Sequence, residues 1–321
     1  MKEFNNDVEA IDALAADYNR LRNEIGKTII GQDEVVKYVL LSVFSDGHSL
    51  LVGVPGLAKT LLIKTIADVL DLSFKRIQFT PDLMPSDITG TEILDEHRNF
   101  KFLRGPVFAN IILADEINRT PPKTQASLLE AMQEKNVTVG GMLHPLDLPF
   151  FVLATQNPIE QEGTYPLPEA QLDRFMFNIT LDYPSVKEEM QVVKSTTTDK
   201  KITMQKIIGK SEIIAYQHLI RRMPIADNVL EYAVNLATKT RPATAQAHAS
   251  ATEYLSWGAG PRASQYLVLG AKSHAAIIGK YSPDMEDVRA VALPILRHRV
   301  VKNYKAEAEG IGVDDIIKGL L

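Results

Sequence analysis

The beginning of the chain carries an apolar pattern that is typical of an amphipathic helix. Apolar side chains recur there at steps of three and four residues, at Ile11, Leu14, Tyr18, Leu21 and Ile25. The helix is expected to end near Gly26, because glycine commonly follows the last turn of a helix. We therefore predict that residues 1–26 form an N-terminal helix that precedes and caps the main domain.

Short apolar runs then alternate with helical patterns and predict β-strands. The predicted strands are residues 49–52, 76–79, 110–114, 150–154 and 175–181. Strands that alternate with helices are typical of a parallel sheet whose two faces are both covered. Because ligands of such open sheets bind beyond the carboxyl ends of the strands, polar residues at those ends are candidates for a functional site.

Two inserted segments interrupt this alternation and are predicted to be β-hairpins. Residues 91–105 are expected to turn near residues 96–99, and residues 136–149 are expected to turn at Gly140-Gly141. Each hairpin is either a decoration of the surface or a protruding contact for a partner, and the sequence favours neither interpretation.

The strand pattern stops after residues 182–184, and the rest of the chain follows helical patterns. Gly/Pro-containing or polar segments separate these helices, at residues 196–201, 223–224, 241–242, 258–261 and 282–283. We therefore predict two domains after the N-terminal helix. An α/β core covers residues 27–185, and a smaller all-helical domain covers residues 186–321.

Composition restricts the classes of protein to which the chain can belong. Its 321 residues are 45% hydrophobic and 23% charged, as in ordinary globular proteins long enough for two domains. A net charge of -5 provides no electrostatic footprint for nucleic acid. No apolar run approaches the roughly 18 residues that span a bilayer, and the N-terminus lacks the layout of a signal peptide. We therefore expect a cytoplasmic location.

The absence of cysteine narrows the available chemistry. Without cysteine the chain has no disulfide, no thiol nucleophile and no cysteine-based zinc site. Its seven histidines show no close spacing of the kind that binds a metal ion. Catalysis is therefore expected to depend on carboxylates, lysine, arginine and Mg²⁺.

A glycine loop between the first predicted strand and the following helical pattern is the most informative motif. Its residues are Gly53, Val54, Pro55, Gly56, Leu57, Ala58, Lys59 and Thr60. Backbone N–H groups of such a loop can surround a polyphosphate, Lys59 can reach the β- and γ-phosphates, and the Thr60 hydroxyl can ligate Mg²⁺. The sequence therefore predicts a binding site for a nucleoside triphosphate.

Ala58 departs from the usual spacing of this motif, in which glycine precedes the lysine. If Ala58 adopts helical φ and ψ at the start of the helix, a methyl group there costs little. The two remaining glycines of the loop, Gly53 and Gly56, then provide the turn.

Two acids, Asp115 and Glu116, follow the apolar strand that ends at Ala114. Downstream of a phosphate-binding loop, Asp115 suits the Mg²⁺ shell, and Glu116 suits the orientation and deprotonation of the attacking water. The alternative is an acidic strand end that faces solvent. We favour the catalytic pair, because binding alone does not require a second acid, and this choice implies hydrolysis.

Asn157 and Arg174 are further candidates, and each has a structural alternative. Asn157 precedes Pro158, so it either begins a turn or positions water against the γ-phosphate. Arg174 ends a short predicted helix, and its guanidinium suits the charge that builds on transferring phosphoryl oxygens. The alternative for Arg174 is a surface ion pair with Asp173, which would contribute little stability.

Together these motifs resemble those of AAA+ ATPases, and more closely those of the MoxR branch. The most specific stretches are residues 53–60, 113–119 and 154–175, and alanine at position 58 is common in that branch. The resemblance extends from about Ile29 to Leu181 and more loosely through the helical domain. It implies an α/β fold: an AAA+ P-loop core with a parallel five-stranded sheet and β-hairpin inserts, followed by a smaller all-helical lid domain.

The resemblance also implies a role for the matching positions of the nucleotide site. The segment that lines the adenine is matched by Ile29, Ile30 and Gly31, and the Walker A loop by residues 53–60. Asp115 and Glu116 match the Walker B pair. The cofactors implied are therefore ATP and Mg²⁺, with Thr60 and Asp115 as the residues that hold the metal.

The remaining matches concern residues that sense or complete the site. Asn157 matches sensor 1, and Arg174 falls where the arginine finger is expected. In this superfamily the finger reaches the nucleotide of a neighbouring subunit, so the resemblance implies a homo-oligomeric ring, usually a hexamer. Arg262 matches sensor 2, at a helix start that Pro261 favours. An arginine in a first turn is otherwise mildly unfavourable against the helix dipole, which makes a phosphate partner attractive.

The function that the resemblance implies is ATP-driven remodelling of other proteins. The two predicted hairpins match the helix-2 and pre-sensor-1 inserts, which engage substrates or partners in relatives. MoxR relatives are thought to act as chaperones for client proteins, often with von Willebrand factor A domains, and for cofactor insertion. Two alternatives stay open: a nucleotide-gated assembly scaffold with negligible turnover, and a nucleic-acid motor, which the acidic balance makes unlikely.

Overall fold

The computed structural model describes residues 6–94, 96–159, 163–199 and 203–321. Parts of several predictions lie outside the described residues. These parts are residues 1–5 of the N-terminal segment, residue 95 of the first hairpin, residues 160–162 of the 154–175 motif, and residues 200–201 of the predicted connection.

The chain divides into two compact units. We call residues 19–167 and 179–214 the core unit, and residues 1–18, 168–178 and 215–321 the lid unit. Three elements contribute to both units: α1 (Asp7–Ile25), α8 (Lys210–Arg222) and β9 (Phe177–Leu181). The boundaries expected at residues 26 and 185 stay predictions.

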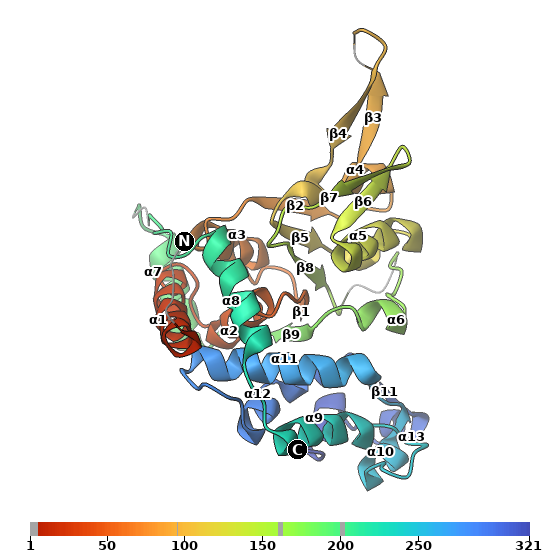
Figure 1. Cartoon of the computed structure of the whole chain (residues 1–321). Helices are drawn as coiled ribbons and strands as arrows, with labels where there is room; N and C mark the ends of the chain where they lie inside the picture. Colours follow the sequence, from red (N-terminus) through yellow and green to blue (C-terminus); the bar gives the residue numbers. More distant parts are fainter. Residues whose placement is uncertain (1–5, 95, 160–162, 200–202) are drawn as a thin grey trace. The chain divides into compact units, whose positions relative to one another are not determined.

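A five-stranded sheet forms the centre of the core unit (Figure 1). Its other strands are β1 (Ser49–Gly53), β2 (Phe74–Gln78), β5 (Ile111–Asp115) and β8 (Phe151–Gln156), and the order is β2-β5-β8-β1-β9. The pairs β2–β5, β5–β8 and β1–β8 are parallel. All five predicted strands are confirmed, with ends that shift by two residues at most.

Both faces of this sheet are covered. Neighbouring residues of a strand point to opposite faces, yet Ile111, Ile112, Leu113 and Ala114 are all 0% exposed. Helices of the core unit with buried faces include α2 (Asp33–Phe44), α3 (Lys59–Val69) and α5 (Pro122–Glu134). The remaining helical elements of this unit are α4 (Pro85–Thr89), η1 (Pro106–Phe108), η2 (Ile117–Arg119) and α7 (Val186–Thr196).

His48, directly before β1, connects α5 to β8. Its Nδ1 accepts a hydrogen bond from the Val152 N–H at 3.1 Å, and its Nε2 donates to the Met132 carbonyl oxygen at 3.1 Å. Burial lowers the pKa of His48 well below its usual value, and the nearby Lys135 charge acts in the same direction. His48 is therefore a neutral side chain at pH 7 that fixes the sheet against α5.

Both predicted hairpins are present in the core unit. β3 (Gly90–Leu94) pairs with β4 (Phe100–Arg104), and β6 (Asn136–Val139) pairs with β7 (Met142–Pro145), both antiparallel. The first hairpin projects well beyond the sheet (Figure 1). Rings of Phe102 and His144 stack with centroids 4.0 Å apart, so the two hairpins contact each other through β4 and β7.

The lid unit is mostly helical. Its helices are α6 (Glu169–Leu172), α9 (Asp227–Lys239), α10 (Ala249–Tyr254), α11 (Pro261–Ile277), α12 (Met285–Leu296), α13 (Tyr304–Ala308) and α14 (Val313–Lys318). The prediction of a purely helical region differs from the structure in one detail. Two short strands, β10 (Leu255–Trp257) and β11 (Val301–Lys302), form an antiparallel pair. These segments are too short to produce a strand pattern in the sequence.

Among the described residues, no helix combines the length and the apolar character that crossing a membrane requires.

Candidate functional site

The glycine loop connects β1 to α3 as predicted. Gly53 ends the strand and Lys59 begins the helix. Gly56 has a φ of +87°, a conformation that favours glycine. Gly53 is needed for a different reason, since a Cβ there would lie 2.7 Å from the Cβ of Leu181. The loop backbone therefore depends on both glycines that the sequence singled out.

Ala58 does not have the helical φ and ψ that would let its methyl group cost little. Ala58 is the N-cap of α3 with a φ of 54° and a ψ of 29°, which is the left-handed region. The chain changes direction between the loop and the helix at this residue, and positive φ provides that change. For a residue with a Cβ the left-handed conformation costs about 1–2 kcal/mol.

We expect Ala58→Gly to raise the free energy of unfolding by about 0.5–1 kcal/mol. The substitution removes the left-handed penalty of about 1–2 kcal/mol, while the added freedom of the unfolded chain offsets about 0.4–1 kcal/mol. Urea denaturation followed by circular dichroism measures the change.

Ala126→Gly is the matched control for this substitution. Ala126 is exposed within α5 of the same unit, and glycine in a helix interior costs about 1 kcal/mol. The two variants should therefore shift stability in opposite directions. An equal loss of stability in both would contradict a left-handed Ala58.

Lys59 extends back across the loop that it ends. Its Nζ donates a hydrogen bond to the carbonyl oxygen of Gly53, the first residue of the loop. Partial burial lowers the pKa of Lys59, while the Asp115 and Glu116 carboxylates act in the opposite direction. The loop, the ammonium group and the two acids therefore lie within electrostatic range of one another.

Asp115 is held on both carboxylate oxygens at the end of β5. Its Oδ1 accepts from the Thr155 hydroxyl at 2.6 Å, and its Oδ2 accepts from the Arg76 guanidinium at 2.6 and 3.0 Å. The side chain is 14% exposed. These contacts fix the orientation of the carboxylate at the carboxyl edge of the sheet.

Glu116 follows in the left-handed conformation, with a φ of 58°. Its N–H donates to the Thr155 hydroxyl at 2.9 Å, so Thr155 ties both acids to β8. Its Oε2 accepts from Gln78 Nε2 at 2.9 Å and from Arg119 Nη1 at 3.0 Å. Glu116 is therefore an oriented carboxylate rather than a freely solvated one.

Thr155, Arg76 and Gln78 were missed by the sequence analysis. Arg76 and Gln78 lie two residues apart on β2, so they share one face of the strand that neighbours β5. They resemble ordinary solvent-facing polar residues of an edge strand. Only Thr155 had a signal, because it lies in the polar run that ends β8.

Asn157 lies just beyond β8, the strand next to β5, and is 8% exposed. Its Oδ1 accepts from the N–H of Ile159 at 3.2 Å, as an asparagine that begins a turn does. The turn fixes the side chain at the same edge of the sheet as Asp115. The structural and the functional interpretation of Asn157 are therefore compatible.

The segment around Ile29–Gly31 lies beside the glycine loop. Gln32 donates from Nε2 to the Leu57 carbonyl oxygen at 3.2 Å, and Ile29 is buried. Among the described residues, the buried Oε1 of Gln32 has no hydrogen-bond partner. Gly31 has a φ of +74°, and a Cβ there would lie 2.7 Å from the Glu188 carboxyl carbon. Gln32 is a further candidate for the site, and the sequence did not indicate it.

Arg174 and Arg262 belong to the lid unit. Arg174 follows α6 in a turn, and its carbonyl oxygen accepts from the Tyr266 hydroxyl at 3.2 Å. Arg262 is the second residue of α11, and its Nη1 lies 3.2 Å from Asp173 Oδ2. Asp173 also pairs with Arg299, at 2.7 Å, which the sequence analysis did not consider. The roles of Arg174 and Arg262 at a nucleotide stay predictions.

The fold and the loop define the class to which the chain belongs. Residues 48–177 match the ATPase family associated with various cellular activities (AAA), and residues 245–320 match the AAA lid domain. A crystal structure of a protein from Cytophaga hutchinsonii superposes with a TM-score of 0.90 at 44% identity, covering 97% of this chain and 95% of that one.

Similar sequences place the chain more narrowly. It is 41% identical to Chaperone MoxR1 of Mycobacterium tuberculosis over 97% of its own length and 83% of that protein. It is 28% identical to Protein MoxR of Methylorubrum extorquens, over 90% of each. The chain belongs to the MoxR family of AAA+ ATPases, as the motifs indicated.

Proposed function

We propose that this chain binds ATP with Mg²⁺ and hydrolyses it, and that turnover drives the remodelling of client proteins. The observation that supports this proposal most directly is the grouping within the core unit. The glycine loop, the Lys59 ammonium and the oriented Asp115 and Glu116 carboxylates belong to one edge of one sheet. Hydrolysis requires all four of these groups, whereas a simple strand connection requires none of them.

The residues present fit a nucleotide and its metal ion. A carboxylate has about four lone-pair sites, so Asp115 retains acceptor capacity beside its bonds to Thr155 and Arg76. Thr60, half-buried at the start of α3, would provide a hydroxyl ligand. Bound Mg²⁺ would neutralise charge on the phosphate oxygens. The buried Oε1 of Gln32 is an acceptor that an amino group of the adenine would satisfy.

Glu116 would act on the attacking water. Its bonds from Gln78 and Arg119 fall on the same oxygen, Oε2, and we assign Oε1 to the water. A carboxylate fixed in this way can orient the water for in-line attack on the γ-phosphorus and accept its proton. Asn157, held at the same edge by its turn, would donate its amide to the water or to the γ-phosphate.

The site would be completed by a second subunit in a homo-oligomeric ring, which we expect to be a hexamer. Arg174 would act there as an arginine finger, and Arg262 would contact the phosphates from the lid. A change in the angle between the core and the lid would then move the two hairpins. Exposed apolar side chains on the first hairpin, among them Leu94 and Phe100, support its role as a contact for a client. Clients with von Willebrand factor A domains are the first candidates.

The experiment that tests this function is phosphate release by the full chain with ATP and Mg²⁺, compared with Lys59→Ala. Loss of charge-assisted hydrogen bonds to the phosphates is expected to weaken ATP binding by about 10- to 100-fold and to abolish turnover. Lys64→Ala, an exposed position on the same helix, is the control and should behave as the wild type.

Two results would count against the proposal. ATP binding without phosphate release, even in the assembled state, would favour the nucleotide-gated scaffold. Equal turnover by Lys59→Ala and the wild type would show that the glycine loop is not the active site. The solution mass with and without ATP, measured in the same samples, establishes whether assembly accompanies binding.

A further inference from the structure

The backbone around Arg174 accepts hydrogen bonds from side chains of the lid unit that lie much later in the chain. Residues 173–176 connect α6 to β9, which begins at Phe177. Within residues 173–178, five carbonyl oxygens accept hydrogen bonds from lid side chains. The acceptors are the carbonyl oxygens of Asp173, Arg174, Phe175, Met176 and Asn178. Regular structure does not require such bonds, so each one restrains the path of this turn specifically.

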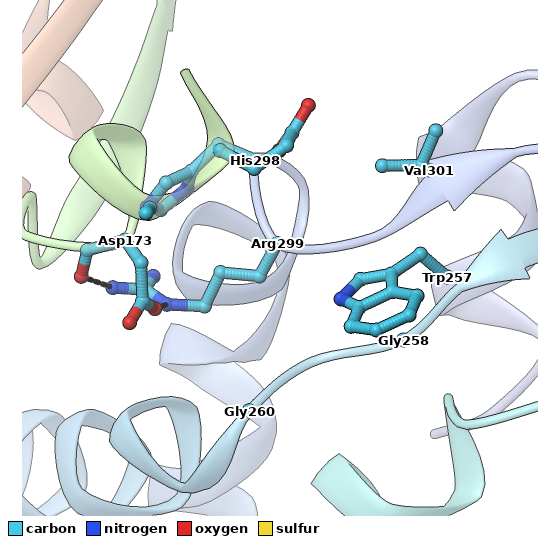
Figure 2. A pocket seen from close by; sticks show the side chains of 9 residues that line it. Asp173, Trp257, Gly258, Gly260, His298, Arg299 and Val301 are labelled. Carbon is cyan, nitrogen blue, oxygen red and sulfur yellow. Dashed lines mark hydrogen bonds and ion pairs between the residues drawn. The ribbon is translucent and has the colours of Figure 1, made fainter. Parts of the chain in front are cut away.

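Arg299 donates half of these bonds. Its Nη2 donates to the carbonyl oxygens of Asp173 and Phe175 at 2.9 and 2.6 Å, and its Nη1 donates to that of Met176 at 3.3 Å. Its Nε bonds the Asp173 carboxylate at 2.7 Å. Figure 2 shows the guanidinium against Asp173, on one side of a cavity of 490 Å³ that Trp257 also lines.

Three other side chains complete this clamp, which consists of Tyr266, Arg297, His298 and Arg299. Arg297 Nη1 donates to the Asn178 carbonyl oxygen at 3.3 Å, and His298 Nε2 donates to that of Phe175 at 3.0 Å. The Tyr266 hydroxyl donates to the Arg174 carbonyl oxygen itself, and the Tyr266 ring lies 5.0 Å from the Arg299 guanidinium. The segment is therefore held by residues 297–299, which follow α12, and by Tyr266 of α11.

Arg299 is unusual for a residue that only contributes to stability. Its side chain is 1% exposed, although the carboxylate that it pairs with is 29% exposed and already has Arg262 as a partner. Removing a charged guanidinium from water is costly, and a buried ion pair is often no more stabilising than an apolar side chain of similar size. The planar guanidinium can, however, donate hydrogen bonds to several carbonyl groups at once and so fix their relative positions.

We propose that Arg299, together with Tyr266, is a positioning residue for Arg174, which it fixes to the lid so that the finger and the lid move together. This inference rests on the proposed function, since it takes Arg174 as the arginine finger. Neither Arg299 nor Tyr266 touches the nucleotide in this scheme. They act on catalysis only through the backbone of residues 173–176.

A double-mutant cycle tests the inference. Arg299→Lys retains the charge but loses the guanidinium and most of its hydrogen bonds, so Arg174 can shift. A displacement of about 1 Å at a catalytic group can cost about 10²-fold in rate. We therefore expect kcat to fall about 10²-fold in the full chain, with KM changed by less than about 3-fold. In the Arg174→Ala background the same substitution should change the rate by less than about 2-fold, because the group that it positions is gone.

Tyr266→Phe is the second variant, because it removes one hydroxyl and cannot be expected to unfold the lid. Loss of its hydrogen bond to the Arg174 carbonyl oxygen should lower kcat by about 2- to 10-fold, and again only when Arg174 is present. Arg289→Lys is the matched control, since Arg289 lies exposed on α12 and pairs with Glu286 instead. Fluorescence of Trp257, the one tryptophan of the chain, reports whether the cavity beside Arg299 is intact.

The possible outcomes are distinct. Equal losses from Arg299→Lys with and without Arg174 would mean that Arg299 only supports the fold, which overturns the inference and leaves the ATPase proposal intact. An unchanged kcat in both Arg299→Lys and Tyr266→Phe would overturn it as well. If Arg174→Ala did not lower the rate, Arg174 would not be the arginine finger. This outcome follows from comparing the wild type with Arg174→Ala alone, without the Arg299 variants.

Discussion

Arg174→Ala is expected to lower kcat for ATP hydrolysis by about 10³- to 10⁵-fold, the range typical of a missing arginine finger. The guanidinium is permanently charged and planar, so it can stabilise the charge that spreads over the transferring phosphoryl oxygens. ATP binding by the core unit of the same subunit should change little, because the loop residues 53–60 and Asp115 are untouched. Phosphate release at saturating ATP and direct titration of ATP measure the two effects separately.

Mixing experiments determine whether the finger acts between subunits. Subunits with Arg174→Ala retain their own Glu116, and subunits with Glu116→Gln retain their own Arg174. In a randomly mixed ring, about a quarter of the interfaces therefore combine an intact finger with an intact acid, and turnover should return in proportion. A mixture as inactive as its components would contradict a finger that acts in trans.

The sheet of the core unit was predictable from sequence because burial on both faces leaves a simple signal. Residues 111–114 and 151–154 read as unbroken apolar runs, and both segments are fully or almost fully buried in adjacent strands. The acids and Asn157 then follow from topology, since parallel neighbours bring their carboxyl ends to one edge. No long-range information was needed for that grouping.

The conformation of Ala58 could not be predicted, because local sequence does not determine the sign of φ at a helix start. Alanine is the best helix former, and a position directly before a helix therefore favours right-handed φ and ψ. In the structure the geometry of the whole loop decides, and Ala58 takes the left-handed conformation despite its Cβ. The tertiary requirement of the loop outweighs a local preference of about 1–2 kcal/mol.

Sequence could not predict the contacts of Arg299, Gln78 and Thr155, for a different reason. Arg299 lies more than one hundred residues after Asp173 along the chain, and Gln78 and Thr155 meet Glu116 only across strands. A role of this kind depends on tertiary contacts between side chains, and a single sequence carries no signal for such contacts. Exposure adds to the difficulty, because a buried arginine is rare enough that solvent exposure is the natural assumption.

Glu116→Gln is expected to lower kcat by about 10²- to 10⁴-fold, the usual contribution of a general base, while ATP binding is retained. The amide has the shape of the carboxylate, and its oxygen can still accept from Gln78 and Arg119. The backbone bond from residue 116 to Thr155 is unaffected. The substitution therefore removes proton acceptance without removing the support of the site. Single-turnover hydrolysis measures the loss of rate, and ATP titration on the same sample measures the retained affinity for ATP.

Glu130→Gln controls for the loss of one negative charge, since Glu130 is an exposed carboxylate on α5 of the same unit. Asp115→Asn should behave differently from Glu116→Gln. Asp115 is assigned to the metal, so its loss should weaken binding of Mg²⁺ and ATP together as well as turnover. If Glu116→Gln reduced binding as strongly as Asp115→Asn, the two acids would share one role. If Glu116→Gln retained the full rate, the water would be activated elsewhere, and Oε2 of Glu116 would serve only as a structural contact to Gln78 and Arg119.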